Sequence, residues 1–208
     1  YVPRFLEEGM ISEQLAVFPT AKSTEVLFLN KTLFDRFSAE TGVTIDSLSS
    51  FEKIADAAIK YYQWTDSKTP HIPNDGKAFY TSDSWFNLVQ VGMKQLNDNF
   101  INNEKLNYNA HFNRFFDLFF ECVVKGGFAI YNGYSSDLSK TGEIVCSTGS
   151  TAGILFYGNT ITYPDNTTED VEYEILPYPV FENGNKVALQ RGSGMIVIKS
   201  TPAKEYAS

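Results

Sequence analysis

Short apolar segments alternate with amphipathic helical segments along this chain, and that alternation constrains the fold more than any other feature. The sequence predicts a strand over residues 26–29, followed by a helix over 31–41 that Gly42 closes. Ser49 and Glu52 are spaced as a capping box for a second helix, which runs to about residue 65. Strands that alternate with helices are typical of an α/β fold with helices on both faces of the sheet, so we expect three layers, α/β/α.

The same pattern continues through the rest of the chain. Helices are expected from a cap at Ser82 or Asp83, over residues 109–125, and from Ala152. Residues 200–208 combine a cap with an early proline and predict a helix that the chain does not complete, so we expect a fragment. Strand-like segments occupy residues 78–80, 144–146, 173–176, 187–189 and 195–198. We expect a tight turn at residues 183–184 and loops over residues 68–77 and 131–140.

The balance of charge argues against two classes of partner. The 208 residues include 25 acidic and 17 basic side chains, a net charge of −8. Nucleic acids and anionic membranes require a basic face, so neither is an expected partner. No apolar run approaches the roughly 20 residues that span a bilayer. The cysteines, Cys122 and Cys146, stand in apolar surroundings, so we expect buried free thiols rather than a disulfide.

Motifs for catalysis and metal binding are weak. The serine-hydrolase elbow needs Gly-x-Ser-x-Gly, and residues 149–153 place the serine one position too early. His71 and His111, the only histidines, belong to no recognisable motif. The acidic run at 165–174 is typical of a solvated face, although a pair of facing glycosidase carboxylates stays open. We predict no catalytic residue, no metal site and no cofactor.

The segment at residues 143–157 is the most informative for function. Ile144, Val145 and Cys146 predict a short buried strand, and four small residues then precede an apolar helical run. A turn between a strand and a helix concentrates unpaired backbone N–H groups and hydroxyls, with the positive end of the helix dipole behind them. Such a turn could hold a phosphate, a carboxylate or a sugar hydroxyl. The alternative is that the small residues only cap the helix.

Trp85 is the aromatic candidate for ligand contact. It follows a short strand and a polar cap, which places it near the C-terminal end of a strand, where open α/β sheets hold ligands. A large flat ring can stack on the apolar face of a sugar. The alternative is that Trp85 is simply the first core residue of its helix.

Four segments, taken in order, carry a family resemblance. They are Phe-Pro-Thr-Ala-Lys-Ser-Thr-Glu-Val-Leu-Phe-Leu-Asn-Lys-Thr-Leu-Phe at 18–34, the 143–157 segment, Tyr-Pro-Val at 178–180, and Leu-Gln-Arg-Gly-Ser-Gly-Met-Ile-Val-Ile-Lys at 189–199. Their order and spacing resemble the family 1 extracellular solute-binding proteins of ABC importers, a group that includes maltose-binding and glycerol-3-phosphate-binding proteins. The resemblance implies one lobe of a periplasmic-binding-protein-like (type II) fold, and a binding role without enzymatic activity or cofactor.

Candidate ligand-binding residues follow from the resemblance. A tryptophan at the place of Trp85 lines the cleft in glycerol-3-phosphate-binding relatives. Arg191 departs from the family pattern, which has small residues there, and either clamps an anion or pairs with the acidic surface. The remaining candidates match a Ser-Ser-Thr run, a Ser-Ser-Gly-Ser run and a glycine-rich hinge run in the same relatives: Ser23 and Thr24; Ser147, Thr148, Gly149 and Ser150; Gly192 and Ser193. Ser23 and Thr24 could equally form a strand-entry turn.

The resemblance also sets expectations for organisation and function. Residues 1–190 would form the second lobe, and residues 191–208 a hinge strand and the start of a truncated helix that returns toward the first lobe. The parent would capture a carbohydrate or a polyol phosphate by hinge closure and deliver it to a membrane permease. It would act outside the cell, lipid-anchored or periplasmic. The alternatives are a carbohydrate-active enzyme or accessory domain, and a structural lobe that never touches a ligand.

Overall fold

The computed structural model describes residues 2–198 and 201–202. Its contacts divide the chain into two compact units, one formed by Tyr1–Thr24 with Gln190–Ser208 and the other by Glu25–Leu189. The division of the chain into a lobe over 1–190 and a hinge segment over 191–208 stays a prediction.

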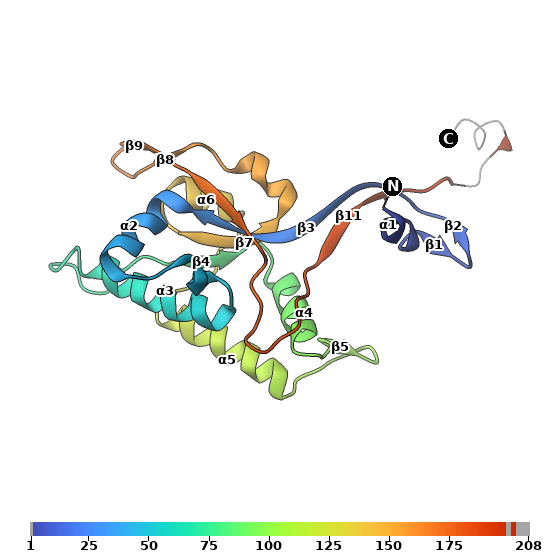
Figure 1. Ribbon diagram of the computed structural model, residues 1–208, viewed down its shortest axis with the longest axis horizontal. Helices are drawn as coiled ribbons and strands as arrows, with labels where there is room; N and C mark the ends of the chain where they lie inside the picture. Colours follow the sequence, from blue (N-terminus) through green and yellow to red (C-terminus); the bar gives the residue numbers. More distant parts are fainter. Residues whose placement is uncertain (1, 199–200, 203–208) are drawn as a thin grey trace. The chain divides into compact units, whose positions relative to one another are not determined.

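The larger unit is built on a mixed sheet (Figure 1). Its strands lie in the order β10 (Tyr173–Leu176), β3 (Phe18–Asn30), β7 (Cys146–Ser150) and β4 (Tyr80–Ser82). β3 is antiparallel to both of its neighbours here, whereas β4 and β7 are parallel. Leu27, Phe28 and Leu29 are all buried although they alternate between the faces of β3, because both faces of the sheet are covered.

Helices cover this sheet on both sides, which confirms the α/β prediction. Figure 1 shows α3 (Phe51–Asp66) and α5 (Ala110–Val124) on one side and α6 (Ser135–Lys140) on the other. The remaining helical elements of the unit are α2 (Lys31–Thr41), α4 (Trp85–Gln95) and two 3₁₀ turns, η1 (Ile45–Leu48) and η2 (Thr151–Phe156).

Local signals explain where α2 begins and ends. Asn30 Oδ1 accepts a hydrogen bond from the N–H of Leu33 at 3.0 Å, which satisfies a donor of the first turn. Gly42 has a φ of 72°, and its N–H donates to Ser38 O at 2.8 Å, so the helix closes in the left-handed conformation that favours glycine. The predicted helix over 31–41 is confirmed.

Two hairpins and a small unit complete the described chain. The hairpins are β5 (Ile101–Asn102) with β6 (Lys105–Leu106), and β8 (Thr160–Thr162) with β9 (Thr168–Asp170). The smaller unit contains α1 (Pro3–Glu7), the hairpin of β1 (Met10–Ile11) and β2 (Gln14–Leu15), and β11 (Gln190–Met195). In this unit β11 runs antiparallel to the first part of β3, from Gln190 opposite Thr24 to Met195 opposite Phe18.

An aromatic cluster forms the core of the larger unit. The Phe51 ring lies within 6.4 Å, centroid to centroid, of four other rings, those of Tyr80, Phe119, Tyr178 and Phe181. Cys122 and Cys146 are both buried and free, as expected. Among the described residues, no helix is both long enough and apolar enough to cross a membrane.

Several predicted boundaries are wrong by a few residues. The cap of α3 is Ser50, whose Oγ accepts from Lys53 N at 3.2 Å, rather than Ser49. The cap of α4 is Ser84 rather than Ser82 or Asp83. β4 lies two residues later than predicted, and β11 ends at Met195 where a strand over 195–198 was expected.

Three other segments differ in kind. Residues 187–189 form no strand, because Val187 O accepts from the side chain of Gln95 instead of from a neighbouring strand. Residues 135–140, expected as part of a surface loop, form α6. The helix expected over 200–208 lies mostly outside the described residues.

Candidate functional site

The C-terminal ends of β4 and β7 meet at one edge of the sheet because the two strands are parallel. Asp83 follows β4 directly and bridges to neighbouring segments. Its N–H donates to Thr148 O at 3.0 Å, and its Oδ1 accepts from Ser135 N at 2.7 Å. Ser84 then caps α4 by accepting from Asn87 N at 3.2 Å. Sequence and topology thus place the start of α4 beside the end of β7, where α/β sheets commonly hold ligands.

The predicted polar turn at the end of β7 is wrong in its conformation. Residues 147–150 continue the strand and pair with β3 and β4. Their backbone groups therefore take part in the sheet and do not form a cluster of free N–H donors. The helical segment that follows is the 3₁₀ turn η2, not an α-helix. Ser150 Oγ accepts from Ala152 N at 3.2 Å, which is the capping role considered as the alternative.

The side chains of Ser147 and Thr148 point into the interior. Each is 1% exposed. Thr148 Oγ1 lies 2.7 Å from Tyr80 Oη and 3.1 Å from Ser82 Oγ, and Ser147 Oγ lies 2.8 Å from Tyr157 Oη. Burial is the main cause that raises the pKa of Tyr157 to about 12, so its hydroxyl stays protonated. These two hydroxyls therefore fix the strand against neighbouring tyrosines.

Gly149 allows a close approach between β7 and the start of α4. A Cβ at this position would lie 2.4 Å from Asp83 Oδ2 and 3.2 Å from Asp83 Cγ. Any larger residue would displace the Asp83 carboxylate, which also accepts from Ser135 N. Gly149 therefore holds the two strand ends in contact.

Trp85 is half-buried at the first position of α4. Its ring meets that of Phe119 edge to face, with 5.7 Å between the centroids, so the indole packs against the aromatic core. Its Nε1 is buried and has no hydrogen-bond partner among the residues that the structure describes. Buried N–H groups without partners are rare, so this donor needs a partner that a solute or a water could supply.

Glu25 and Asn87 join this edge, and the sequence analysis missed both as site residues. Glu25 is only 5% exposed, and its Oε1 accepts from Asn87 Nδ2 at 2.9 Å. Tyr178 lies nearby: burial raises its pKa, and the neighbouring Tyr80 and Glu25 raise it further. Glu25 directly follows Ser23 and Thr24 and precedes the apolar residues 26–29. An acidic residue at the start of an apolar strand is the sequence signal that could have identified Glu25.

The other predicted residues lie together in the smaller unit. Across the β3–β11 ladder Ser23 faces Arg191 and Thr24 faces Gln190, while Gly192 and Ser193 face Lys22 and Ala21. Gly192 has a φ of 155°, and a Cβ there would lie 2.2 Å from Ala21 O, so the pairing requires glycine. The prediction thus divides between two units: Ser23, Thr24, Arg191, Gly192 and Ser193 in one, Trp85 and residues 147–150 in the other.

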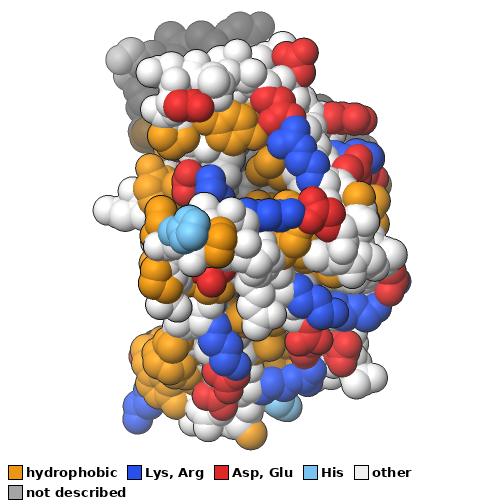
Figure 2. Space-filling model, turned by 90° about the vertical axis from the view of Figure 1, so that its left-hand side faces the viewer, with side chains coloured by type: hydrophobic (Ala, Val, Ile, Leu, Met, Phe, Trp, Pro, Cys, Tyr) orange, Lys and Arg blue, Asp and Glu red, His pale blue; other side chains and the backbone are white. Residues whose placement is uncertain are grey.

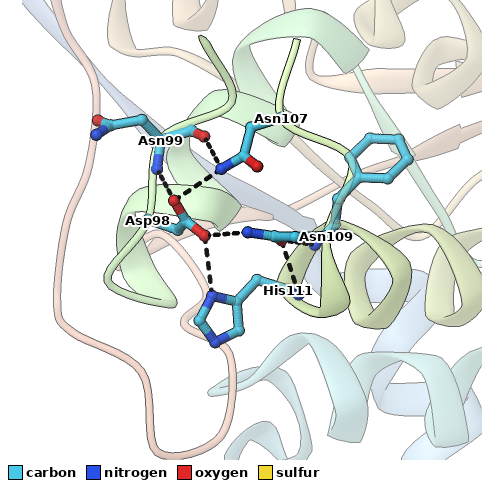
Figure 3. A network of polar contacts seen from close by, with 6 residues as sticks. Asp98, Asn99, Asn107, Asn109 and His111 are labelled. Atoms are coloured by element: carbon cyan, nitrogen blue, oxygen red, sulfur yellow. Dashed lines mark hydrogen bonds and ion pairs between the residues drawn. The ribbon is translucent and has the colours of Figure 1, made fainter. Parts of the chain in front are cut away.

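A second polar network, shown in Figure 3, surrounds Asp98. Its carboxylate accepts from Asn107 Nδ2 at 2.9 Å, from Asn109 Nδ2 at 2.5 Å and from the N–H of Asn99 at 2.7 Å, and lies 3.2 Å from His111 Nδ1. These bonds, that from Asn109 foremost, lower the pKa of Asp98 to about 2. Because Asn109 also caps α5, the network ties the β5–β6 hairpin to that helix. We interpret His111 here as structural.

Other kinds of site find little support in the described part of the chain. No group of three His, Cys, Asp or Glu side chains there could hold a metal ion. Figure 2 shows basic and acidic side chains interspersed over one face, without the continuous basic surface that a nucleic acid requires. A largely apolar pocket of about 540 Å³ lies between η1 and residues 176–188, and none of the predicted site residues lines it.

Comparisons with known proteins agree with this architecture. A family model described as bacterial extracellular solute-binding protein matches residues 1–208. A search of the curated proteins found no match. Among solved structures, the maltose-bound protein MalE3 of T. maritima is 12% identical with a TM-score of 0.72, and 100% of this chain aligns with 51% of that chain.

Two further solved structures align in the same way. UgpB of Mycobacterium tuberculosis, in complex with glycerophosphocholine, is 15% identical with a TM-score of 0.71, and 100% of this chain covers 49% of it. A solute-binding protein of Agrobacterium radiobacter K84, in complex with ribitol, is 15% identical with a TM-score of 0.68, and 99% of this chain covers 50% of it. The chain thus spans about half the length of these structures, and at such identities the likeness establishes the fold.

Proposed function

This chain belongs to the bacterial extracellular solute-binding proteins, and from that membership we propose that it forms one wall of a solute-gripping cleft in the binding component of an ABC importer. The family consists of binding proteins and not enzymes, so the alternative of a carbohydrate-active enzyme is set aside. The structures that align with this chain are about twice its length. We therefore place the opposing wall in a second lobe that closes over the solute by a hinge motion.

The observation that carries the proposal is the polar edge at the ends of β4 and β7. The buried carboxylate of Glu25 accepts there from the half-buried amide of Asn87, at 2.9 Å. The unpartnered Nε1 of Trp85 belongs to the same helix as Asn87, at its first turn. Sugar-like solutes present hydroxyls that both donate and accept, so they suit a surface that offers both functions.

A carbohydrate or a polyol phosphate is the proposed solute. Aligned structures carry maltose, ribitol and glycerophosphocholine, and all three are rich in oxygen. Arg191, in the smaller unit, stays a predicted phosphate contact, because guanidinium groups bind phosphate oxygens in bidentate fashion. We further propose that the solute is passed to a separate permease, and that the protein acts outside the cell, lipid-anchored or periplasmic.

Thermal unfolding with a small panel of solutes tests the proposal. Maltose, ribitol and glycerophosphocholine at millimolar concentration are added to the complete protein, and at least one should raise Tm. Glu25→Gln and Trp85→Ala should each remove most of that rise. Trp64→Ala is the matched control, because Trp64 is also half-buried but donates to Glu40 on α2, at 2.9 Å. A panel that leaves Tm unchanged, or a rise that survives both variants, contradicts the proposed site.

A further inference from the structure

A loop over residues 130–134 lies at the same edge of the sheet as the candidate site. Phe128 forms a parallel bridge with Tyr80 of β4, and Ala129 N donates to Tyr80 O at 2.9 Å. Because the two segments run in the same direction, the chain leaves this bridge at the carboxyl end of β4, where Asp83 lies. Sequence alone predicted a surface loop here and no part of a site.

The loop is fixed in position beside the start of α4. At its end, Ser135 N donates to Asp83 Oδ1 at 2.7 Å. Within it, the ring of Tyr131 lies against Gly133, where an added Cβ would lie 2.4 Å from Tyr131 Cε1. The backbone that carries Tyr134 is therefore held on both sides, and its side chain starts from a defined place at the edge.

Tyr134 presents an open aromatic surface there. Its side chain is 74% exposed, compared with 41% for Tyr131. Trp85, by contrast, is half-buried, and its ring packs edge to face on Phe119. A sugar ring that reaches this edge therefore finds more aromatic surface on Tyr134 than on Trp85.

The order of the strands sets the distance between this loop and the polar pair of Glu25 and Asn87. Glu25 belongs to β3, and the sheet continues through β7 and β4 to the segment of Phe128, so three strand spacings separate Glu25 from the loop. At about 4.8 Å for each spacing, the span is roughly 14 Å. A single sugar ring or a short polyol is smaller than that, so a solute that contacts both ends of the edge is a chain of sugar rings.

We propose that Tyr134 forms a second subsite, which binds an oligosaccharide at the opposite end of the edge from Glu25. The inference rests on the proposed function and narrows its solute to a carbohydrate of two or more rings. A tyrosine ring packs on the apolar C–H face of a sugar, and its hydroxyl stays in water. An acyclic polyol phosphate has no flat face for this ring and is too short to reach it from Glu25.

The competing occupant of this surface is the rest of the binding protein, because the aligned structures are about twice as long as this chain. The two occupants differ in what they do without a solute. A protein contact on Tyr134 stabilises the unliganded form, so Tyr134→Ala would then lower its Tm. A sugar subsite leaves that Tm unchanged and acts only when sugar is bound.

Calorimetric titration of the complete protein tests the inference. The panel consists of the one-, two- and three-ring members of the maltose, cellobiose and xylobiose series, with ribitol and glycerophosphocholine. We expect an oligosaccharide to bind more tightly than its own monosaccharide. Tyr134→Ala should weaken the oligosaccharide roughly tenfold and the monosaccharide little, because covering an aromatic side chain contributes more than 1 kcal/mol. Tyr134→Phe, which keeps the ring, should retain most of the affinity.

Tyr108→Ala is the matched control and should leave every affinity unchanged. Tyr108 is 66% exposed, and its ring packs on Phe112 of α5, with 5.0 Å between the centroids. Two results overturn the subsite and leave the proposed function standing: a panel in which only single rings, ribitol or glycerophosphocholine bind, and an oligosaccharide whose affinity falls in Glu25→Gln but not in Tyr134→Ala. A fall of Tm in unliganded Tyr134→Ala also overturns it. A panel in which nothing binds contradicts the proposed function itself.

Discussion

Replacing Gln95 by methionine tests whether one buried amide holds the segment that leads from β10 to β11. Gln95 ends α4 and is 0% exposed. Its Nε2 donates to Pro179 O at 2.9 Å and to Val187 O at 3.1 Å, and its Oε1 accepts from Phe181 N at 3.1 Å. Three backbone groups of an irregular segment thus depend on one side chain.

The cost of the substitution follows from those three bonds. Methionine has nearly the volume of glutamine, so packing changes little, but it offers no comparable donor or acceptor. A hydrogen bond contributes about 1 kcal/mol net, and a buried group left unpaired costs about 1–3 kcal/mol. The two carbonyl groups can partly recover by opening to water, so we expect a loss of about 3–5 kcal/mol in the free energy of unfolding.

Urea unfolding at low protein concentration measures this loss. With a slope near 2 kcal/mol per molar urea, the midpoint should fall by about 2 M. Gln63→Met is the matched control, because Gln63 is exposed on α3 and its substitution should change stability by about 0.5 kcal/mol or less. Equal midpoints for Gln95→Met and the control would refute the reasoning, since the amide would then not be what satisfies this segment.

Three further predictions follow from the described contacts. Asp98→Asn should destabilise the chain at pH 7 and have a smaller effect at low pH. The Asp98 carboxylate, with a folded pKa of about 2, contributes its full stabilisation above its unfolded pKa of about 3.9 and loses it as the pH falls through the folded value. Unfolding midpoints of both proteins between about pH 2 and 7 measure the difference. Ser50→Ala should cost about 1 kcal/mol of unfolding free energy and Ser49→Ala less, as urea unfolding of both variants will show, because Ser50 caps α3. Gly149→Ala should weaken binding of any solute that raises Tm, measured by calorimetry, because its Cβ would displace Asp83, and an unchanged affinity would contradict the role given to this edge.

Parts of the fold were predictable because local chemistry decides them. The helix over 31–41 has a capping asparagine at one end and a glycine with positive φ at the other, and both signals act within four residues. By contrast, α6 resembles a polar loop in sequence. Ser135 and Ser139 are buried in it because their hydroxyls lie 2.9 and 2.7 Å from Tyr157 Oη and Tyr173 Oη, tyrosines more than 20 residues away.

The same limit applies to the candidate site. Trp85 and the 147–150 segment were found from composition and family pattern, and topology brings both to the ends of β4 and β7. Glu25 and Asn87 were missed because their bond joins residues 62 positions apart. A single sequence does not reveal which polar residue at the start of one strand will meet which residue on a helix packed beside another.

The burial of Ser147 and Thr148 changes which residues can act on a solute. Their hydroxyls are paired with tyrosines in the interior, so Thr148→Val should destabilise the fold more than it weakens any solute's affinity. Besides Glu25 and Trp85, the half-buried side chains of Asp83, Asn87 and Ser150 remain for contact. If this edge is the cleft wall, variants at those three positions will lower affinity by more than their change in stability explains, and a Thr148 variant will lower stability by more than it lowers affinity. That separation distinguishes a solute-binding edge from a sheet edge that is only capped.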